Sequence, residues 1–233
     1  MPVRAENATE EAILSRRSIR GFLPDPVPRD VVEHLLNIAA RAPSGTNMQP
    51  WRVLVLAGEA LADFTAGLVA AWQDNLAARG EPDGPEHEYY PSPLFEPYIG
   101  RRRRIGWDLY GLLGIARGER DKARAHVERN LRFFGAPVGL LLLADRRLEI
   151  GSWLDLGMFL QSLAIAARAR GLGTCPMAVF AEHPRAIRRL LGVSEQDRVV
   201  CGMAIGHEDS SAPANALRTE RVPATSFAEF RGF

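Results

Sequence analysis

The sequence predicts a layered domain built from α-helices and a few β-strands, of the α+β or α/β class. Amphipathic helical patterns alternate with only three or four short apolar runs, and such runs are typical of buried strands. The 233 residues are enough to bury a substantial core, and 46% hydrophobic with 24% charged residues is typical of a soluble globular protein. We therefore expect one domain, without internal repeats.

Helices are predicted where apolar residues recur on one helical face. Val32, Leu35 and Leu36 show this spacing after Asp30, which with its neighbours is a candidate helix start. The predicted helical ranges are 9–16, about 30–40, 59–79, two segments within 94–134, 150–170 and about 183–191.

Strands and loops follow from the remaining segments. Strands are predicted at the continuous apolar runs 51–57, 138–144 and 199–206, with CPMAV at 175–179 as a fourth candidate. Residues 80–93 carry four prolines and predict a long surface loop, which in a compact domain is usually functional or mobile. The irregular chain after Glu208 is too apolar for a solvated tail, so we expect it to pack along another surface, such as that of a second subunit.

Several features predict a cytoplasmic protein without a membrane span. The N-terminal residues lack the apolar core of a signal peptide, and no stretch reaches the ~18 apolar residues that cross a bilayer. Cys175 and Cys201 both lie in apolar stretches, where free thiols behave as small hydrophobic groups, so a reducing compartment is expected.

Hydrolytic and metal chemistry is not predicted. The sequence has no GxSxG, HExxH, Walker or GxGxxG motif, no CxxC, and five histidines that do not cluster at metal-ligand spacing. Cys175 and His183 are near in sequence, but this is no evidence for a nucleophile and its base.

The run RRRR at 101–104 is the strongest charge feature in a chain whose net charge is only +1. Residues 101–134 carry ten basic and four acidic side chains. One interpretation is a solvated helix face that pairs with nearby acids. Another is an anion site, such as one for the phosphate of a nicotinamide nucleotide. Nucleic acid binding is disfavoured, because a locally compensated basic stripe releases few counterions.

Two polar segments carry the best candidate chemistry. SRRSIRGF at 15–22 places three arginines and a serine at a helix exit, and arginine forks match phosphate oxygens bidentately. APSGTNMQPW at 42–51 concentrates small hydrogen-bonding groups on a backbone freed by glycine, where a short turn would have joined helix and strand.

Taken together, these segments resemble the FMN-dependent nitroreductase family over nearly the whole chain. No single motif is decisive, but their order and spacing are specific. The matching segments are RRSIR (16–20), PSGTNMQPW (43–51), FGAPVGLLLLAD (134–145), the helix from Trp153, GLGTCPM (171–177), GMAIG (202–206) and RTERVP (218–223).

The resemblance implies an α+β fold with a central, mostly antiparallel sheet surrounded by helices. It also implies an intertwined homodimer whose C-terminal segment is exchanged onto the partner, with two FMN molecules at the interface, each touched by both subunits. Residues 1–233 would form a single FMN-binding domain, with a helical insertion or lid at about 72–134 that supplies aromatic side chains for stacking.

The resemblance also implies cofactor-binding roles near both ends of the chain. Arg16 and Ser18 match phosphate-binding positions, with Arg17 in support. Arg20 matches a basic position beside the flavin pyrimidine edge, and Arg221 a second phosphate-binding position. Thr219 stands where many relatives have an additional lysine.

Two further segments would contact the flavin. The first would touch the FMN bound mainly by the other subunit and comprises Pro43, Ser44, Gly45 and Asn47. The second would lie against one flavin face, with backbone N–H groups near N5, and comprises Pro176, Met177 and Ala178.

The expected reaction is ping-pong reduction of small aromatic acceptors. NADH or NADPH would pass a hydride to FMN, and a nitroaromatic compound or a quinone would then take two electrons. No protein side chain is expected to act as the catalytic group, and no metal is expected. Nitro groups would go to nitroso and then hydroxylamine.

Other functions remain open from sequence. Related enzymes dehydrogenate substrates, dehalogenate aromatics or fragment reduced flavin. From a different class, the chain would be a flavin-binding regulatory module whose basic patch at 101–134 contacts a partner.

Overall fold

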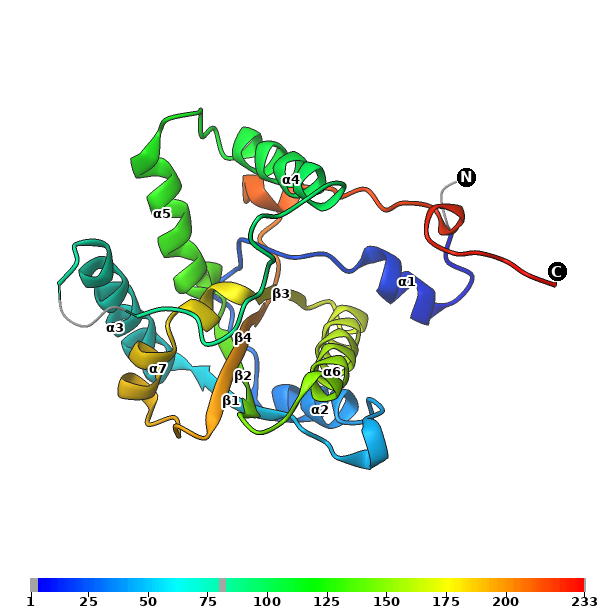
Figure 1. Cartoon of the computed structure of the whole chain (residues 1–233), viewed down its shortest axis with the longest axis horizontal. Helices are drawn as coiled ribbons and strands as arrows, with labels where there is room; N and C mark the ends of the chain where they lie inside the picture. Colours follow the sequence, from blue (N-terminus) through cyan, green and yellow to red (C-terminus); the bar gives the residue numbers. More distant parts are fainter. Residues whose placement is uncertain (1–3, 80–82, 233) are drawn as a thin grey trace.

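The computed structural model, which describes residues 4–79 and 83–232, has a four-stranded antiparallel sheet at its centre (Figure 1). The strands are β1 (Arg52–Ala57), β2 (Val138–Asp145), β3 (Gly173–Met177) and β4 (Asp197–Gly206). Their order is β1-β2-β4-β3, with β1 and β3 at the edges. The structure confirms the α+β alternative, because each pair of neighbouring strands is antiparallel.

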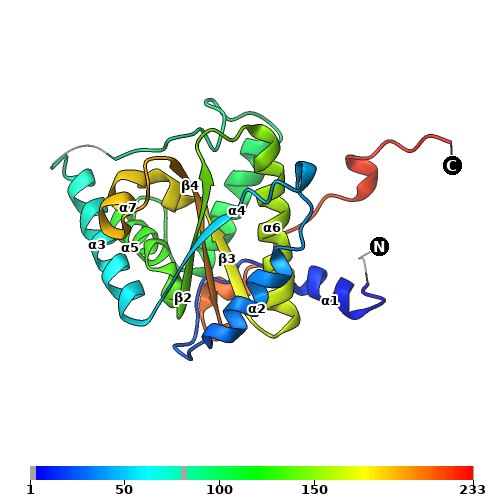
Figure 2. The same ribbon diagram turned by 90° about the horizontal axis from the view of Figure 1, so that it is seen from below.

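Helices cover both faces of this sheet. Figure 2 shows α3, α5 and α7 on one face, and α2 and α6 on the other. The helices are α1 (Ala8–Ser15), α2 (Arg29–Ala39), α3 (Gly58–Leu76), α4 (Tyr98–Leu112), α5 (Arg120–Leu131), α6 (Ile150–Ala169) and α7 (Pro184–Leu191). The predicted ranges are confirmed to within a few residues.

Strand β2 has a continuous apolar sequence because both of its faces are buried. Leu141 and Leu143 belong to the core beside α3, whereas Leu140 and Leu142 belong to the core beside α2 and α6. Alternate side chains of a strand point to opposite faces, so a sheet between two helical layers needs apolar residues at every position.

The central strand β4 packs closely against the short helical segment η3 (Ala178–Glu182). Gly202 of β4 lies directly beneath Phe180 of this segment, and a Cβ at Gly202 would lie only 2.3 Å from the phenyl ring. This position therefore requires glycine for close approach of a buried aromatic ring to the strand.

Helix α6 has the length and hydropathy of a membrane span, contrary to the expectation that no stretch of the chain is long and apolar enough. Its buried side chains, including Leu156, Phe159 and Leu163, pack in the core beneath the sheet. It also contacts α1, α2 and β3. These contacts explain its high hydropathy, because its apolar side chains pack in the core of the protein.

Helix α1 begins one residue before the predicted Thr9 because Asn7 caps it. The Asn7 side chain accepts a hydrogen bond from the Glu10 backbone N–H at 3.0 Å, and the Glu10 carboxylate accepts one from the Glu6 N–H at 2.6 Å. This reciprocal arrangement satisfies backbone donors at the helix start.

The chain between α3 and α4 is fixed to the core at its beginning. The Asp83 carboxylate accepts hydrogen bonds from the backbone N–H groups of Arg185 and Ala186 at the start of α7. Glu86 forms ion pairs with Arg146 at 2.6 Å and Arg188 at 2.8 Å. Residues 80–82 of the predicted loop lie outside the described residues.

Helix α4 and the start of α5 lie away from the sheet (Figure 1), whereas both ends of the predicted insertion lie in the core. Trp72 of α3 and Leu131 of α5 are buried there, as are the next two aromatic residues, Phe133 and Phe134. These last two side chains are therefore core residues rather than exposed stacking groups.

The last described residues extend away from the body of the molecule (Figures 1 and 2). The short helical segment η4 (Pro213–Ala216) still packs against α4. Beyond it, Phe227 is 72% exposed and Phe230 is 62% exposed. Phe233, also predicted to be in this apolar tail, lies outside the described residues.

Candidate functional site

A cavity of about 550 Å³ lies between the chain after α1, one face of α4 and the segment after η4. It brings together five of the predicted site residues, four of them within 16–20 and the fifth, Arg221, about two hundred residues away in sequence. Its lining residues are Arg16, Arg17, Ser18, Arg20, Gly100, Arg101, Arg104, Ile105, Asp108, Leu217, Arg218, Thr219, Glu220 and Arg221.

The segment after α1 is held along the outer edge of β3. Ser18 forms a parallel bridge with Thr174, and the Ile19 N–H donates to the Thr174 carbonyl at 3.0 Å. The Ile19 side chain is buried against Gly173, where a Cβ would lie 2.8 Å from it. Burial of this one residue therefore fixes the arginines on either side of it.

Asn215, buried in η4, ties this segment to the C-terminal part of the chain. Its side chain accepts from the Arg20 N–H at 2.7 Å and donates to the Gly21 and Asp209 carbonyls at 2.8 Å each. No pattern in the sequence marks this residue, because its partners are backbone groups brought near only by the fold.

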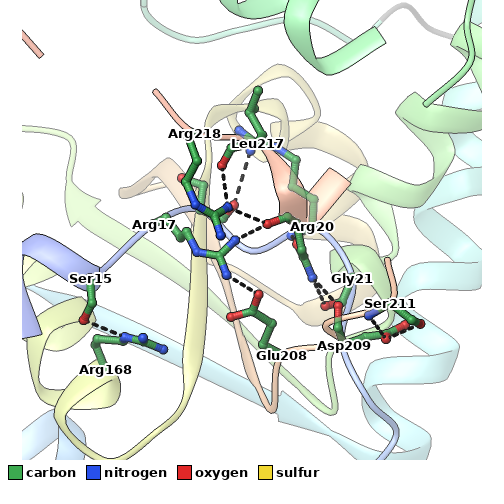
Figure 3. Close-up of polar contacts among 12 residues, drawn as sticks. Ser15, Arg17, Arg20, Gly21, Arg168, Glu208, Asp209, Ser211, Leu217 and Arg218 are labelled. Atoms are coloured by element: carbon green, nitrogen blue, oxygen red, sulfur yellow. Dashed lines mark hydrogen bonds and ion pairs between the residues drawn. The ribbon is translucent and has the colours of Figure 1, made fainter. Parts of the chain in front are cut away.

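Arg17 and Arg218 lie side by side (Figure 3) and meet at the Asn215 backbone. Both guanidinium groups donate to the Asn215 carbonyl oxygen, and Arg17 also forms an ion pair with Glu208. Arg17 therefore has a structural partner of opposite charge, which agrees with a supporting role. Sequence reasoning missed both Arg218 and Glu208.

Arg16 and Arg221 form a pair of like charges in the cavity. The Arg16 Nε is buried and has no hydrogen-bond partner among the described residues. Burial and the positive charge of Arg221 lower the Arg16 pKa. The hydrogen bonds of Arg221 go to the uncharged oxygens of Thr219 and Glu220, at 2.7 to 3.5 Å. This geometry favours binding of an anion between the two guanidinium groups.

The loop at 43–47 does not line this cavity. It lies against α6, where the Gly45 N–H donates to both carboxylate oxygens of the buried Asp155 at 3.3 Å. The Ser44 hydroxyl accepts from the Gln49 N–H at 3.0 Å. Thr46 and Asn47 have φ values of 50° and 61°, an unusual conformation for residues with a side chain.

The segment 176–178 also lies outside the cavity, at the end of β3. Met177 is buried and Pro176 is exposed. Ala178 contributes to a second cavity of about 420 Å³, which Tyr89 and Tyr90 also line. Within one chain, the predicted cofactor-binding residues therefore lie in three separate places: 16–20 with Arg221, 43–47, and 176–178.

Comparison with known proteins identifies the family to which this arrangement belongs. The profile of the nitroreductase family matches residues 13–207. This chain belongs to the nitroreductase family.

Similar enzymes align with the nitroreductase chain over nearly its full length. It is 41% identical to the chloronitrobenzene nitroreductase of Comamonas testosteroni, covering 95% of this chain and 96% of that protein. It is 39% identical to the 4-nitrobenzoate reductase of Pseudomonas putida, covering 96% of each chain.

Solved structures show the same fold. The FMN and NADPH-dependent nitroreductase NfnB from sphigopyxis sp. strain HMH superposes with a TM-score of 0.90 at 36% identity, covering 97% of this chain and 99% of that one. The FMN-dependent nitroreductase NfnB from Mycobacterium smegmatis, in complex with NADPH, gives a TM-score of 0.90 at 31% identity, covering 96% and 98%.

Thr219, the position at which the resemblance put one cation contact in doubt, lines the cavity. Arg218, its neighbour in sequence, lines the cavity as well. Position 218 therefore supplies a positive charge one residue away, although the predicted set did not include it.

Neither cysteine of this nitroreductase is suited to nucleophilic chemistry. Cys175 and Cys201 are free and buried, and burial raises their thiol pKa values to about 11 and about 12. His183 is buried as well, and burial lowers its pKa. The described residues contain no His, Cys, Asp and Glu group suited to a metal ion.

We predict that the folded protein does not react with a thiol reagent such as Ellman's reagent at about pH 8, where a free cysteine reacts readily. Both thiols stay protonated at that pH because their pKa values lie well above it. Their burial also shields them from the reagent. In guanidinium chloride both should react. Rapid modification of either thiol in the folded protein would contradict their burial.

Proposed function

We propose that this chain is an FMN-dependent NAD(P)H nitroreductase that reduces nitroaromatic compounds. The observation that carries this proposal is the arginine-lined cavity, in which Arg16 and Arg221 form no ion pair with any acidic side chain of the described residues. Relatives named for nitroaromatic substrates, at 39 to 41% identity over nearly the whole chain, support the substrate class. We extend the proposal to quinones on chemical grounds, since they also accept two electrons.

The residues of the cavity fit an FMN phosphate. Arg16 and Arg221 would donate to its oxygens, and the unpartnered Nε of Arg16 offers one donor for this purpose. The Ser18 hydroxyl would add a further donor. Arg20 would lie toward the flavin pyrimidine edge, where a cation stabilises negative charge on the ring.

Bound FMN would accept a hydride from NAD(P)H and pass two electrons to the nitro group. The chain's own residues would bind and orient this group. Backbone N–H groups of the segment 176–178 would lie along one flavin face. We propose the same role for Pro43, Ser44, Gly45 and Asn47 toward the flavin of a second subunit.

We further propose a homodimer in which α6 and the C-terminal segment contact the partner. Ile150 and Leu154, on the outer face of α6, are 82% and 71% exposed. The loop at 43–47 packs on this same helix through Asp155, which would place it at the interface. The outer edge of β1 pairs with no other described strand, which leaves room for an exchanged segment.

The segment at about 72–134, which includes α4 and α5, would act as a lid over the site within a single domain. Its aromatic side chains Tyr89, Tyr90 and Trp107 are at least half exposed, and would be available to stack on a flat acceptor. We also propose a cytoplasmic location, supported by two free cysteines.

Replacing Arg16 or Arg221 by alanine should weaken FMN binding. Each change removes charge-assisted hydrogen bonds to phosphate, worth about 1.5 to 3 kcal/mol, so the Kd for FMN should rise roughly tenfold to a hundredfold. Titration of the apoprotein with FMN, followed by flavin fluorescence, measures this change.

Arg147→Ala is the matched control for these variants. Arg147 is exposed and pairs with Asp145 in a turn after β2, outside the cavity. It should leave the Kd for FMN unchanged. If Arg16→Ala and Arg221→Ala bind FMN as tightly as the unmodified chain, the phosphate assignment is wrong.

Leu154→Arg should disrupt the dimer. An unpaired buried charge destabilises an interface by about 3 to 5 kcal/mol. In a twofold dimer both subunits carry the substitution, so the free energy of dimerisation would include this penalty twice. Sedimentation velocity should show a monomer, and FMN should be lost with it, because residues 43–47 of the partner would be missing from the site.

Leu76→Arg on α3 is the control for the dimer prediction. Leu76 is also exposed, but α3, whose last residue it is, lies on the opposite side of the sheet from α6 (Figure 2). This variant should stay dimeric. A Leu154→Arg protein that also stays dimeric and keeps FMN would exclude α6 from the interface.

A further inference from the structure

The four arginines at 101–104 lie on helix α4, and two of them line each of two cavities. Arg101 and Arg104 line the cofactor cavity together with Asp108. Arg102 and Arg103 line a different cavity of about 990 Å³, between α4 and α5. Residues three and four apart share a helical face, so consecutive arginines must separate in this way. Half of the run therefore faces the proposed FMN site.

The cofactor cavity holds more positive charge than FMN alone requires. It is lined by seven arginines and two acidic residues, and Glu208 balances one of the arginines, Arg17. The phosphate of FMN carries a charge of about −2. About two positive charges would remain after FMN binds, which is enough for a second phosphate group.

Arg101 and Arg104 are available to supply these charges. The Arg101 guanidinium lies 5.9 Å from the centre of the Tyr98 ring, and no ion pair to it occurs among the described residues. Arg104 lies 3.3 Å from the Asp108 carboxylate and 3.7 Å from that of Glu220, which is 87% exposed. Long, exposed ion pairs of this kind contribute little, so a phosphate would readily replace them.

We propose that Arg101 and Arg104 bind a phosphate group of the nicotinamide nucleotide donor, on the α4 side of the cofactor cavity. This inference rests on the proposed function. The phosphate is either the 2′-phosphate, which NADPH has and NADH lacks, or the pyrophosphate that both nucleotides carry. In either case, the side of α4 that faces the cavity determines how tightly the donor binds.

The test compares Arg101→Gln and Arg104→Gln with Arg103→Gln as the matched control. Arg103 belongs to the same run but faces the other cavity. Initial rates are measured with NADPH and with NADH at saturating 4-nitrobenzoate, together with the FMN content of each protein. Circular dichroism verifies that each exposed substitution leaves the fold intact.

Both cavity-facing variants should raise the KM for the donor about tenfold, the effect of losing one charge-assisted contact. The kcat and the FMN content should stay as in the unmodified enzyme, and Arg103→Gln should behave like that enzyme throughout. A rise in the KM for NADPH alone assigns the site to the 2′-phosphate. A rise in the KM for both nucleotides assigns it to the pyrophosphate.

Three results would overturn the inference. They are an unchanged donor KM in both variants, an equal rise in Arg103→Gln, and a change confined to FMN content or to the KM for 4-nitrobenzoate. These are distinct from a failure of the proposed function, in which the unmodified, FMN-loaded protein would oxidise neither NADPH nor NADH.

Discussion

The burial of Ile19 at the edge of the sheet is the constraint on which the site depends. Its backbone N–H bonds to Thr174 of β3, and its side chain fills the space that Gly173 leaves by lacking a Cβ. An apolar residue fixed in this way holds its charged neighbours at the surface of the cavity. The arginines on either side of Ile19 are therefore positioned by the hydrophobic packing of Ile19. Because the buried side chain is apolar, this positioning requires no buried charge.

Electrostatic balance then separates a structural arginine, Arg17, from the two arginines that we propose to bind phosphate, Arg16 and Arg221. Arg17 has Glu208 as its partner and a backbone carbonyl beside it, so its charge is already compensated. Among the described residues, Arg16 and Arg221 have no such compensation, and their mutual repulsion contributes to the lowered pKa of Arg16. An anion placed between them would remove this repulsion. The lack of acidic partners for these two cations therefore suits the phosphate that we propose to bind there.

Sequence predicted the elements whose pattern is local. The run VGLLLLAD indicated a buried strand because β2 lies between two helical layers. The arginines at 16–20 led to the phosphate hypothesis because they are close in sequence, and the structure shows that they line one cavity. The contributions of Asn215 and Arg218 were not predictable, because their partners lie nearly two hundred residues away or are backbone groups. The division of residues 101–104 between two cavities also required the helix to be placed against the rest of the molecule.

The central claim is that this cavity holds FMN that cycles between donor and acceptor. The most direct test is the absorption spectrum of the purified protein, recorded anaerobically before and after NADPH is added, and again after a nitroaromatic compound is added. We predict flavin bands that bleach with the donor and recover with the acceptor. A colourless protein that takes up no added FMN, or a bound flavin that neither nucleotide reduces, would contradict the account.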